Sequence, residues 1–340
     1  MLDVVSEPNN IGPLESYYAD HKEANAVEEQ NTYDDDDDSC DILHFKRSLL
    51  WETNVLFQRT SRNLFRHRSL FFMHVLISIL LATFTGLLFA NVTPDLAGFQ
   101  NRTGALYFVL TFFGFASFSS IDLFLTEREI FSRETGARYY SPFSYFIAKM
   151  TMDTLTLRVL PATLFASIFY WIMGLQNTSN HFFVFLITLI LFNVAAGSLS
   201  VCISIYSSTA GAANLTATFI FLIMLLFGGF LLNIDTLPGY IKWLRYTSIF
   251  YYAFEILLTN ELDGIVLSFD APNLPAVPVN GDVFLETLGL KMEDQLIDIV
   301  ALVMIIILLN ALAYILLTLR VPSTAQLRAS SSKQQELTSM

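Results

Sequence analysis

The stretch LFFMHVLISILLATFTGLLFA, from Leu70 to Ala90, contains no Asp, Glu, Lys or Arg. It is as long as the ~20 predominantly apolar residues that an α-helix needs to cross a bilayer core. Other runs share this property and lie at Phe182–Ile205, Ala212–Leu232 and Ile299–Leu319. Uncharged runs of this length predict an integral membrane protein.

The composition agrees with this interpretation. Of the 340 residues, 54% are hydrophobic and 15% are charged, whereas about a quarter of the residues of a soluble domain are charged. Much of the net charge of -12 comes from acidic residues before His44, including Asp34–Asp38. The rest of the chain is closer to neutral, so the acidity belongs to a terminal segment and we expect no nucleic-acid partner.

Residues 1–45 are polar and acidic and show little periodicity, which predicts a disordered linker. The aspartate run could bind a cation, but a solvated, self-repelling linker is the favoured interpretation. The first residues, Met1–Glu7, lack the basic flank and apolar core of a signal peptide. We therefore expect the first transmembrane helix to direct membrane insertion.

Residues 46–67 have the periodicity of an amphipathic helix. Apolar residues such as Leu49 and Leu56 fall on one face, and charged residues such as Glu52 and Arg59 fall on the opposite face. A basic amphipathic helix before a membrane span tends to lie along the inner membrane surface. The pattern alone does not exclude a soluble helix that packs on a partner.

The predicted fold class is an all-α membrane protein with six transmembrane helices preceded by this amphipathic surface helix. The spans are expected at about 70–90, 104–125, 144–173, 182–205, 212–232 and 296–319. Residues 233–295 should form an extracellular helical loop between helices five and six, with short helices that dip into the outer leaflet and then a Pro-rich stretch. Together, residues 46–320 would form one membrane domain, followed by a cytosolic tail at 321–340.

The orientation is predicted from Lys and Arg residues near the span ends. Six of them lie between Lys46 and Arg68, so we expect both termini in the cytosol. Glycosylation signals begin at Asn91, Asn101 and Asn177, all in loops expected outside. Neither cysteine, Cys40 or Cys202, falls in such a loop, so no disulfide is expected there.

Motifs of several enzyme classes are missing from the sequence. It contains no Gly-x-x-x-x-Gly-Lys-Ser/Thr phosphate loop, no His-Glu-x-x-His zinc helix and no Gly-x-Ser-x-Gly turn. We therefore expect no catalytic residue, no metal site and no cofactor bound by this chain.

Charged residues inside the predicted spans are costly unless they are paired or hydrated. They are Asp122 on span two and Lys149, Asp153 and Arg158 on span three. The structural interpretation is a network of buried ion pairs, with Arg158 paired to Asp122 or Asp153. The functional interpretation is a relay that couples cytosolic events to helix movement. We favour the structural one.

Several stretches, in order, carry a resemblance to a known family. They include Gly104–Phe108, Glu127–Glu134, Tyr139–Pro142, Ser144–Lys149, Arg158–Pro161, Phe227–Asn233, Trp243–Ser248 and Asn260–Leu262. Across nearly all of residues 46–320 the chain resembles the membrane domain of G-type ABC transporters, the white-pigment, sterol and multidrug half-transporters. Met1–Glu7 is similar to the end of that family's nucleotide-binding domain, so the chain is expected to begin where the ATPase ends.

The resemblance also implies roles for individual residues. Contacts with the nucleotide-binding domain would involve Glu127, Arg128, Arg133, Glu134, Tyr139 and Tyr140. A substrate cavity at a dimer axis would be lined by Phe112, Phe115, Leu215, Thr218, Phe219, Leu222 and Leu225. An extracellular plug would consist of Phe230 and Leu231, where relatives often have two leucines. From the residues alone, the aromatic side chains of span two could equally serve packing or lipid contact.

The implied function is export of lipid, sterol or other apolar or amphipathic molecules across the plasma membrane or an endomembrane. The chain would act as a homodimer or a heterodimer with another G-type half-transporter. ATP and Mg would be bound by the nucleotide-binding domain of the complete transporter. Two alternatives remain: a non-transporting dimerisation partner or regulator, and an ATP-independent channel or scramblase.

Overall fold

The computed structural model describes residues 49–66, 68–90, 92–93, 95–136, 139–232, 238–269, 277–290 and 295–319. The chain divides into two compact units, residues 1–51 and 52–340, and the membrane bundle belongs to the second. The predicted linker at 1–45, the tail at 321–340 and the sequon at Asn91 lie outside the described residues.

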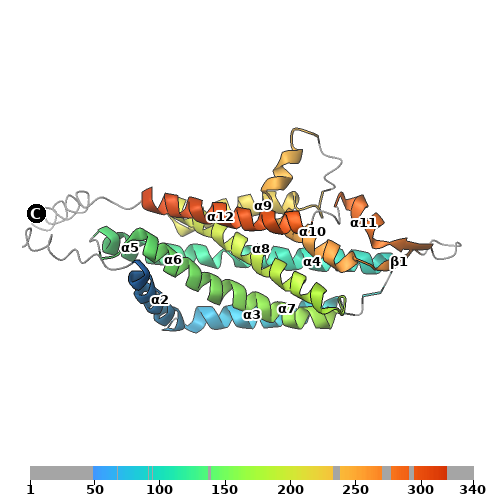
Figure 1. Cartoon of the computed structure of the whole chain (residues 1–340), viewed down its shortest axis with the longest axis horizontal. Coiled ribbons are helices and arrows are strands. Elements are labelled where there is room, and N and C mark those ends of the chain that lie inside the picture. The colour runs from blue at the N-terminus through green and yellow to red at the C-terminus, as the bar shows by residue number, and fades with distance from the viewer. Residues whose placement is uncertain are drawn as a thin grey trace, which may run out of the picture. The chain divides into compact units, whose positions relative to one another are not determined.

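Helices make up most of the described residues of the second unit (Figure 1). Their bounds are α2 (Leu49–Arg66), α3 (Arg68–Leu88), α4 (Leu96–Ala116), α5 (Ser119–Gly136), α6 (Pro142–Asp153), α7 (Leu160–Met173), α8 (Ser179–Tyr206), α9 (Ala210–Leu226), α10 (Ile249–Leu262), α11 (Gly281–Leu288) and α12 (Gln295–Leu319). Among the residues that the structure describes, five helical segments are long and apolar enough to cross a membrane, and α9 is a shorter apolar helix. The predicted class, an all-α membrane protein, is confirmed.

Span two is longer than the sequence predicted and consists of two helices. Asp95 caps α4, because its side chain accepts a hydrogen bond from the Gly98 amide at 2.7 Å. Between α4 and α5 the Ser117 hydroxyl bonds to the Gly114 carbonyl and lies 2.8 Å from the Ser200 hydroxyl of α8. The contact with Ser200 joins this junction to α8.

Span three contains a π-turn at Thr154–Val159 between α6 and α7. The Leu160 amide donates to the carbonyl of Leu155, five residues earlier, instead of to the residue four earlier. Pro161 follows at the start of α7 and has no N–H to donate. The wider turn therefore replaces one regular helical turn just before a proline, and it contains Arg158.

Span five ends earlier than expected. The prediction ran to residue 232, but α9 ends at Leu226 and is capped by Phe227. Gly229 has a φ of 91°, a conformation that favours glycine and does not continue a helix. Phe230 and Leu231 consequently lie beyond the helix.

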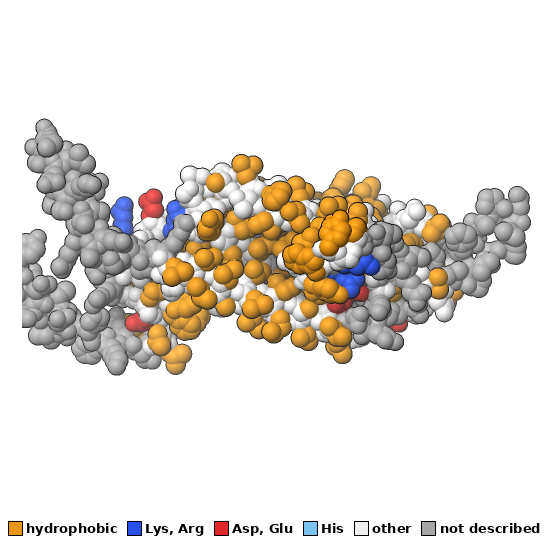
Figure 2. Space-filling view, turned by 90° about the horizontal axis from the view of Figure 1, so that it is seen from above, with side chains coloured by type: hydrophobic (Ala, Val, Ile, Leu, Met, Phe, Trp, Pro, Cys, Tyr) orange, Lys and Arg blue, Asp and Glu red, His pale blue; other side chains and the backbone are white. Residues whose placement is uncertain are grey.

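The bundle is built around α8, which packs against α12, α10, α5 and α7, while α3 lies beside α7 (Figure 1). Small residues of α8, including Ala195, Ala196 and Gly197, are buried and allow neighbouring helices to approach closely. The surface is different: Figure 2 shows hydrophobic side chains across much of the visible face, with charged side chains toward its ends.

The segment between α9 and α12 contains a 3₁₀ helix, Lys242–Thr247, and then α10, every residue of which is buried. Short helices were predicted here. An antiparallel ribbon of β1 (Val266–Phe269) and β2 (Val277–Asn280) was not, and it pairs Val266 with Asn280. Since α10 is buried throughout, it is part of the protein core and not a free loop.

Candidate functional site

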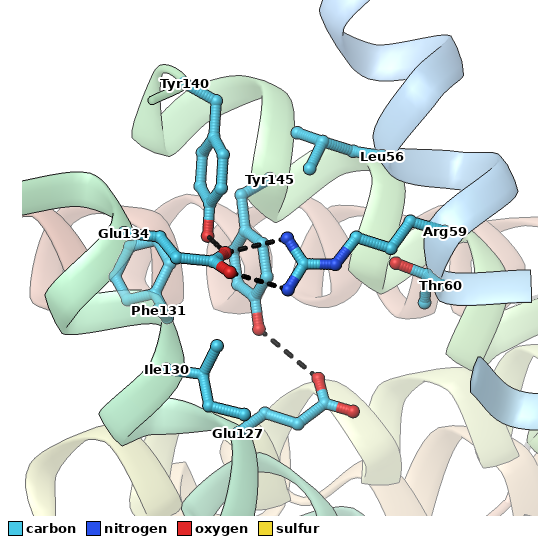
Figure 3. A pocket seen from close by; sticks show the side chains of 9 residues that line it. All are labelled: Leu56, Arg59, Thr60, Glu127, Ile130, Phe131, Glu134, Tyr140 and Tyr145. Carbon is cyan, nitrogen blue, oxygen red and sulfur yellow. Dashed lines mark hydrogen bonds and ion pairs between the residues drawn. The ribbon is translucent and has the colours of Figure 1, made fainter. Parts of the chain in front are cut away.

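The first candidate site lies where α2, α5 and the start of α6 meet (Figure 3). A pocket of about 60 Å³ is lined by Leu56, Arg59, Thr60, Glu127, Ile130, Phe131, Glu134, Tyr140 and Tyr145. We call this set the α2–α5 site. Three of the residues to which the resemblance assigned contact with a nucleotide-binding domain are among them.

Arg59 and Glu134 form the centre of the site. The two terminal nitrogens of Arg59 bond to the two carboxylate oxygens of Glu134 at 2.8 and 2.6 Å, and the Tyr140 hydroxyl donates to the same carboxylate at 2.9 Å. The Arg59 side chain is 56% exposed. Exposed ion pairs contribute about 0–1 kcal/mol, so this pair fixes geometry more than it stabilises the fold.

A second connection joins α2 to the start of α6. The Glu52 carboxylate accepts hydrogen bonds from the amide and hydroxyl of Ser141 and from the hydroxyl of Ser144, at 3.4, 3.3 and 3.1 Å. Ser141 is itself the N-cap of α6. The Glu52 carboxylate therefore connects α2 to the first turn of span three.

Lys149 joins α5 to α6 in the same region. Its Nζ lies 2.8 Å from a carboxylate oxygen of Glu127 and 3.2 Å from one of Asp153, and its side chain is 4% exposed. The Tyr145 hydroxyl donates to Glu127 at 3.3 Å. This is a buried ion-pair network between spans two and three.

The remaining residues of the predicted network lie apart. Asp122 is exposed on α5. Arg158 makes no ion pair with a described carboxylate: it donates to the Ser117 carbonyl at 3.0 Å, to the Ser120 hydroxyl, and to Asn193 at 3.4 Å. The prediction that Arg158 pairs with Asp122 or Asp153 is therefore wrong. Asp153 takes Lys149 as its partner, because both lie one turn apart on α6.

The other residues of the predicted coupling set differ in their contacts. Arg128 donates to the carbonyls of Ser207 and Ser208 at 2.6 and 3.3 Å, which connects α5 to the end of α8. Arg133 and Tyr139 are exposed at the same end of the bundle. The surface there thus presents a cation and an aromatic ring beside the α2–α5 site.

The second candidate site is the outer face of α9. Leu215, Phe219 and Leu222 are 75%, 65% and 50% exposed, and Thr218 and Leu225 are half-buried. We call these five residues the α9 face. They follow helical spacing, so a largely apolar strip of this span is left uncovered by the described residues.

Residues of span two differ in their relation to this face. Phe115 packs against Phe118 and against Phe221 of α9, with ring centroids 5.5 and 6.4 Å apart. Phe112 points elsewhere and lines a separate cavity beside α3. The structure therefore brings Phe115, and not Phe112, to α9.

The predicted plug residues lie just beyond the end of α9. The ring of Phe230 lies 4.8 Å from that of Tyr107 and 6.0 Å from that of Phe254. Leu231 is 53% exposed. The Tyr107 hydroxyl also bonds to the Leu225 carbonyl, which anchors the end of α9 to α4.

A polar cluster at the opposite end of the bundle was missed as a site. Buried Arg102 bonds to Glu261 at 3.0 Å, and the Gln176 amide group bonds to the Glu261 carbonyl at 2.8 Å. Burial raises the pKa of the Glu261 carboxyl to about 7. A signal was present in the sequence, because Glu261 is one of two acids, with Glu255, in a mostly apolar and aromatic segment.

Two of the predicted glycosylation sites lie among the described residues. Both Asn101 and Asn177 are exposed at this end of the bundle.

Among the described residues, no group of three His, Cys, Asp or Glu side chains is placed to hold a metal ion. Both candidate sites instead consist of contacts between helices and an uncovered membrane face.

Comparison with known proteins identifies the family. The family model described as ABC-2 type transporter matches residues 52–262. The chain belongs to the ABC-2 type transporter family. The match begins in α2 and ends with α10, so it contains the α2–α5 site, Phe115 and the α9 face.

Its relatives are G-family ABC transporters. ABC transporter G family member 24 of Dictyostelium discoideum is 35% identical over 75% of this chain and 22% of its own length. The broad substrate specificity ATP-binding cassette transporter ABCG2 of Mus musculus is 33% identical over 66% of this chain and 33% of its own length. Protein white of Drosophila melanogaster is 34% identical over 71% and 35%. The matched part of this ABC-2 type chain thus spans about a fifth to a third of these relatives.

Proposed function

We propose that this ABC-2 type chain is the membrane-spanning part of an exporter for lipids, sterols or other apolar or amphipathic molecules. ATP hydrolysis is supplied by a nucleotide-binding domain, where ATP and Mg bind. The chain pairs with a second copy or with another G-type half-transporter. Both termini face the cytosol, and the sequons at Asn91, Asn101 and Asn177 face the opposite side.

The α9 face is the observation that carries this proposal. Large apolar side chains of a membrane span are exposed in the single chain, next to the half-buried ring of Phe115. A second protomer placed against this face would enclose a space with aromatic and aliphatic walls. Such walls suit flat apolar ligands.

The α2–α5 site supports the requirement for a nucleotide-binding domain. Ion pairs and hydrogen bonds connect α2 to α5 and to the first turn of span three. A nucleotide-binding domain that contacts Arg133, Tyr139 or α2 would therefore displace spans two and three together. The mouse relative is named as an ATP-binding cassette transporter of broad substrate specificity, which agrees with such an arrangement.

The experiment is efflux of a fluorescent sterol from cells that express the chain fused behind the nucleotide-binding domain of a G-family relative. We expect ATP-dependent efflux that Phe219→Ala lowers, whereas the control Phe72→Ala, on the exposed face of α3, leaves it unchanged. Efflux by the chain alone without ATP would favour a channel or scramblase. A chain that dimerises without efflux, and that suppresses efflux by a co-expressed relative, would favour a non-transporting regulator.

A further inference from the structure

A second cavity lies inside one protomer, away from the α9 face. It has a volume of about 210 Å³ and lies between α3, α4, the π-turn and α8. Its polar lining consists of His74 and Ser78 on α3, Arg158 in the π-turn and Asn193 on α8. Phe112 and Pro161 contribute apolar walls.

Arg158 is the unusual member of this lining. Its residue is 3% exposed, yet its hydrogen-bond partners are a backbone carbonyl, a serine hydroxyl and a side-chain amide, all of them neutral. Within the described part of the chain, no carboxylate lies within salt-bridge distance of it. A buried cation in a membrane span normally lines a pathway or is paired, because the charge is otherwise costly.

The guanidinium also has hydrogen-bonding capacity to spare. Of its five N–H groups, three are used in the bonds to Ser117, Ser120 and Asn193. The Nε side lies against Gly197, where a Cβ would be only 2.8 Å away. The absence of a side chain at 197 therefore makes room for a cation beside the cavity.

Ser78 and His74 face the same space from α3. They are one helical turn apart, so both lie on one face of the helix. Their side chains make no hydrogen bond to another described residue, and each can donate one. Next to them Ile77 lines the cavity and is 42% exposed at the protein surface. The cavity thus has a polar interior and an apolar rim.

We propose that this cavity binds the carboxylate of a single-chain anionic amphiphile, a long-chain fatty acid, through Arg158, Ser78 and His74. The carboxylate would balance the charge of Arg158 and accept its unused N–H. The volume is many times the ~10–15 Å³ of such space that a single water molecule requires. It therefore accommodates a carboxylate and the first few methylenes, with the rest of the chain along α3. The proposal does not depend on the proposed transport function, because binding requires neither ATP nor a partner.

The test uses the full chain in nanodiscs of neutral phosphatidylcholine and a photoreactive derivative of oleic acid. Cross-linked peptides are located by mass spectrometry, and oleate, oleyl alcohol and phosphatidylglycerol serve as competitors. We expect saturable labelling of α3 and of residues 154–161 that oleate displaces and the other two do not. Arg158→Gln should weaken binding by about thirtyfold or more, as for loss of one member of a buried charge pair.

Ser78→Leu is a second test of binding, in which Arg158 is retained. The larger side chain fills the cavity and should abolish labelling in correctly folded protein. Ser167→Leu is the matched control, since Ser167 is exposed on α7 and does not line the cavity. The proposal is overturned if Ser78→Leu labels like the wild type, or if oleyl alcohol competes as well as oleate. Displacement by phosphatidylglycerol would also overturn it, because the ligand would then be a two-chain lipid.

Discussion

Replacement of Gly197 by alanine tests how tightly Arg158 is held. An ideal Cβ at position 197 would lie 2.8 Å from Nε and 3.3 Å from Cζ of Arg158. The end of this side chain is fixed by hydrogen bonds to Ser117, Ser120 and Asn193. It therefore cannot move aside without weakening at least one of those bonds.

The expected loss follows from two opposing effects. Overpacking of a well-filled site costs about 1–3 kcal/mol, whereas alanine in place of glycine in a helix gains about 0.5–1 kcal/mol. Gly197→Ala should thus destabilise the protein by about 1 kcal/mol, within limits of about 0 and 2.5 kcal/mol. The control is Gly104→Ala in α4, where a Cβ would have no neighbour within 4 Å. This change should leave stability unchanged or raise it.

The assay is the apparent melting temperature of the purified protein in detergent, read by size-exclusion chromatography after heating. Gly197→Ala should melt below the wild type and Gly104→Ala should not. In an Arg158→Leu background, Gly197→Ala should no longer destabilise, because the atom that it collides with is gone. If the two alanine variants behave alike, or the penalty at 197 persists without Arg158, the packing argument is wrong.

Three other predictions concern other parts of the molecule. Lys149→Met should lower the free energy of unfolding by about 3–5 kcal/mol, because it leaves two carboxylates without their cation. Arg59→Gln, at the exposed pair, should lower it by less than about 1 kcal/mol. Equal losses of folded yield in the two variants would contradict this dependence on burial. The raised pKa of Glu261, about 7 against 4.5, means that the folded state binds its proton more tightly than the unfolded state. Melting temperature should therefore fall relative to Glu261→Gln as pH rises from about 4.5 to about 7, and a difference that does not change with pH would refute it. Phe221→Ala removes a fully buried ring and should lower the free energy of unfolding by about 3–5 kcal/mol. Phe115→Ala should leave the folded yield nearly intact. If both variants lose the same amount of folded yield, Phe115 is an ordinary packing residue.

The membrane class and most of the spans were predictable from the sequence. Long uncharged runs have few alternatives in a folded protein, so Leu70–Ala90 and Ile299–Leu319 correspond closely to α3 and α12. Boundaries were harder where a helix ends by local chemistry. The apolar run to Leu232 did not reveal that α9 ends at Leu226, because the signal was the Gly228–Gly229 pair and not a loss of hydrophobicity.

The pairing of charges could be predicted only in part. Lys149 and Asp153 are four residues apart in sequence, and helical spacing places them together. The partners of Arg158 depend on the π-turn, which changes the direction of this side chain relative to an ideal helix. Further partners come from other helices: Glu127 of α5 contacts Lys149, and Asn193 of α8 contacts Arg158. Sequence spacing carries no information about those tertiary contacts.

The π-turn at Thr154–Val159 has a consequence for the comparison of relatives of different length. A turn closed between residues five apart contains one residue more than an α-helical turn. Removal of a single residue there would restore an ordinary α-helical turn. Removal of a residue elsewhere in span three would instead rotate one half of the span relative to its neighbouring helices. We therefore expect that single-residue insertions and deletions in span three of homologous chains, where they occur, fall within these six positions.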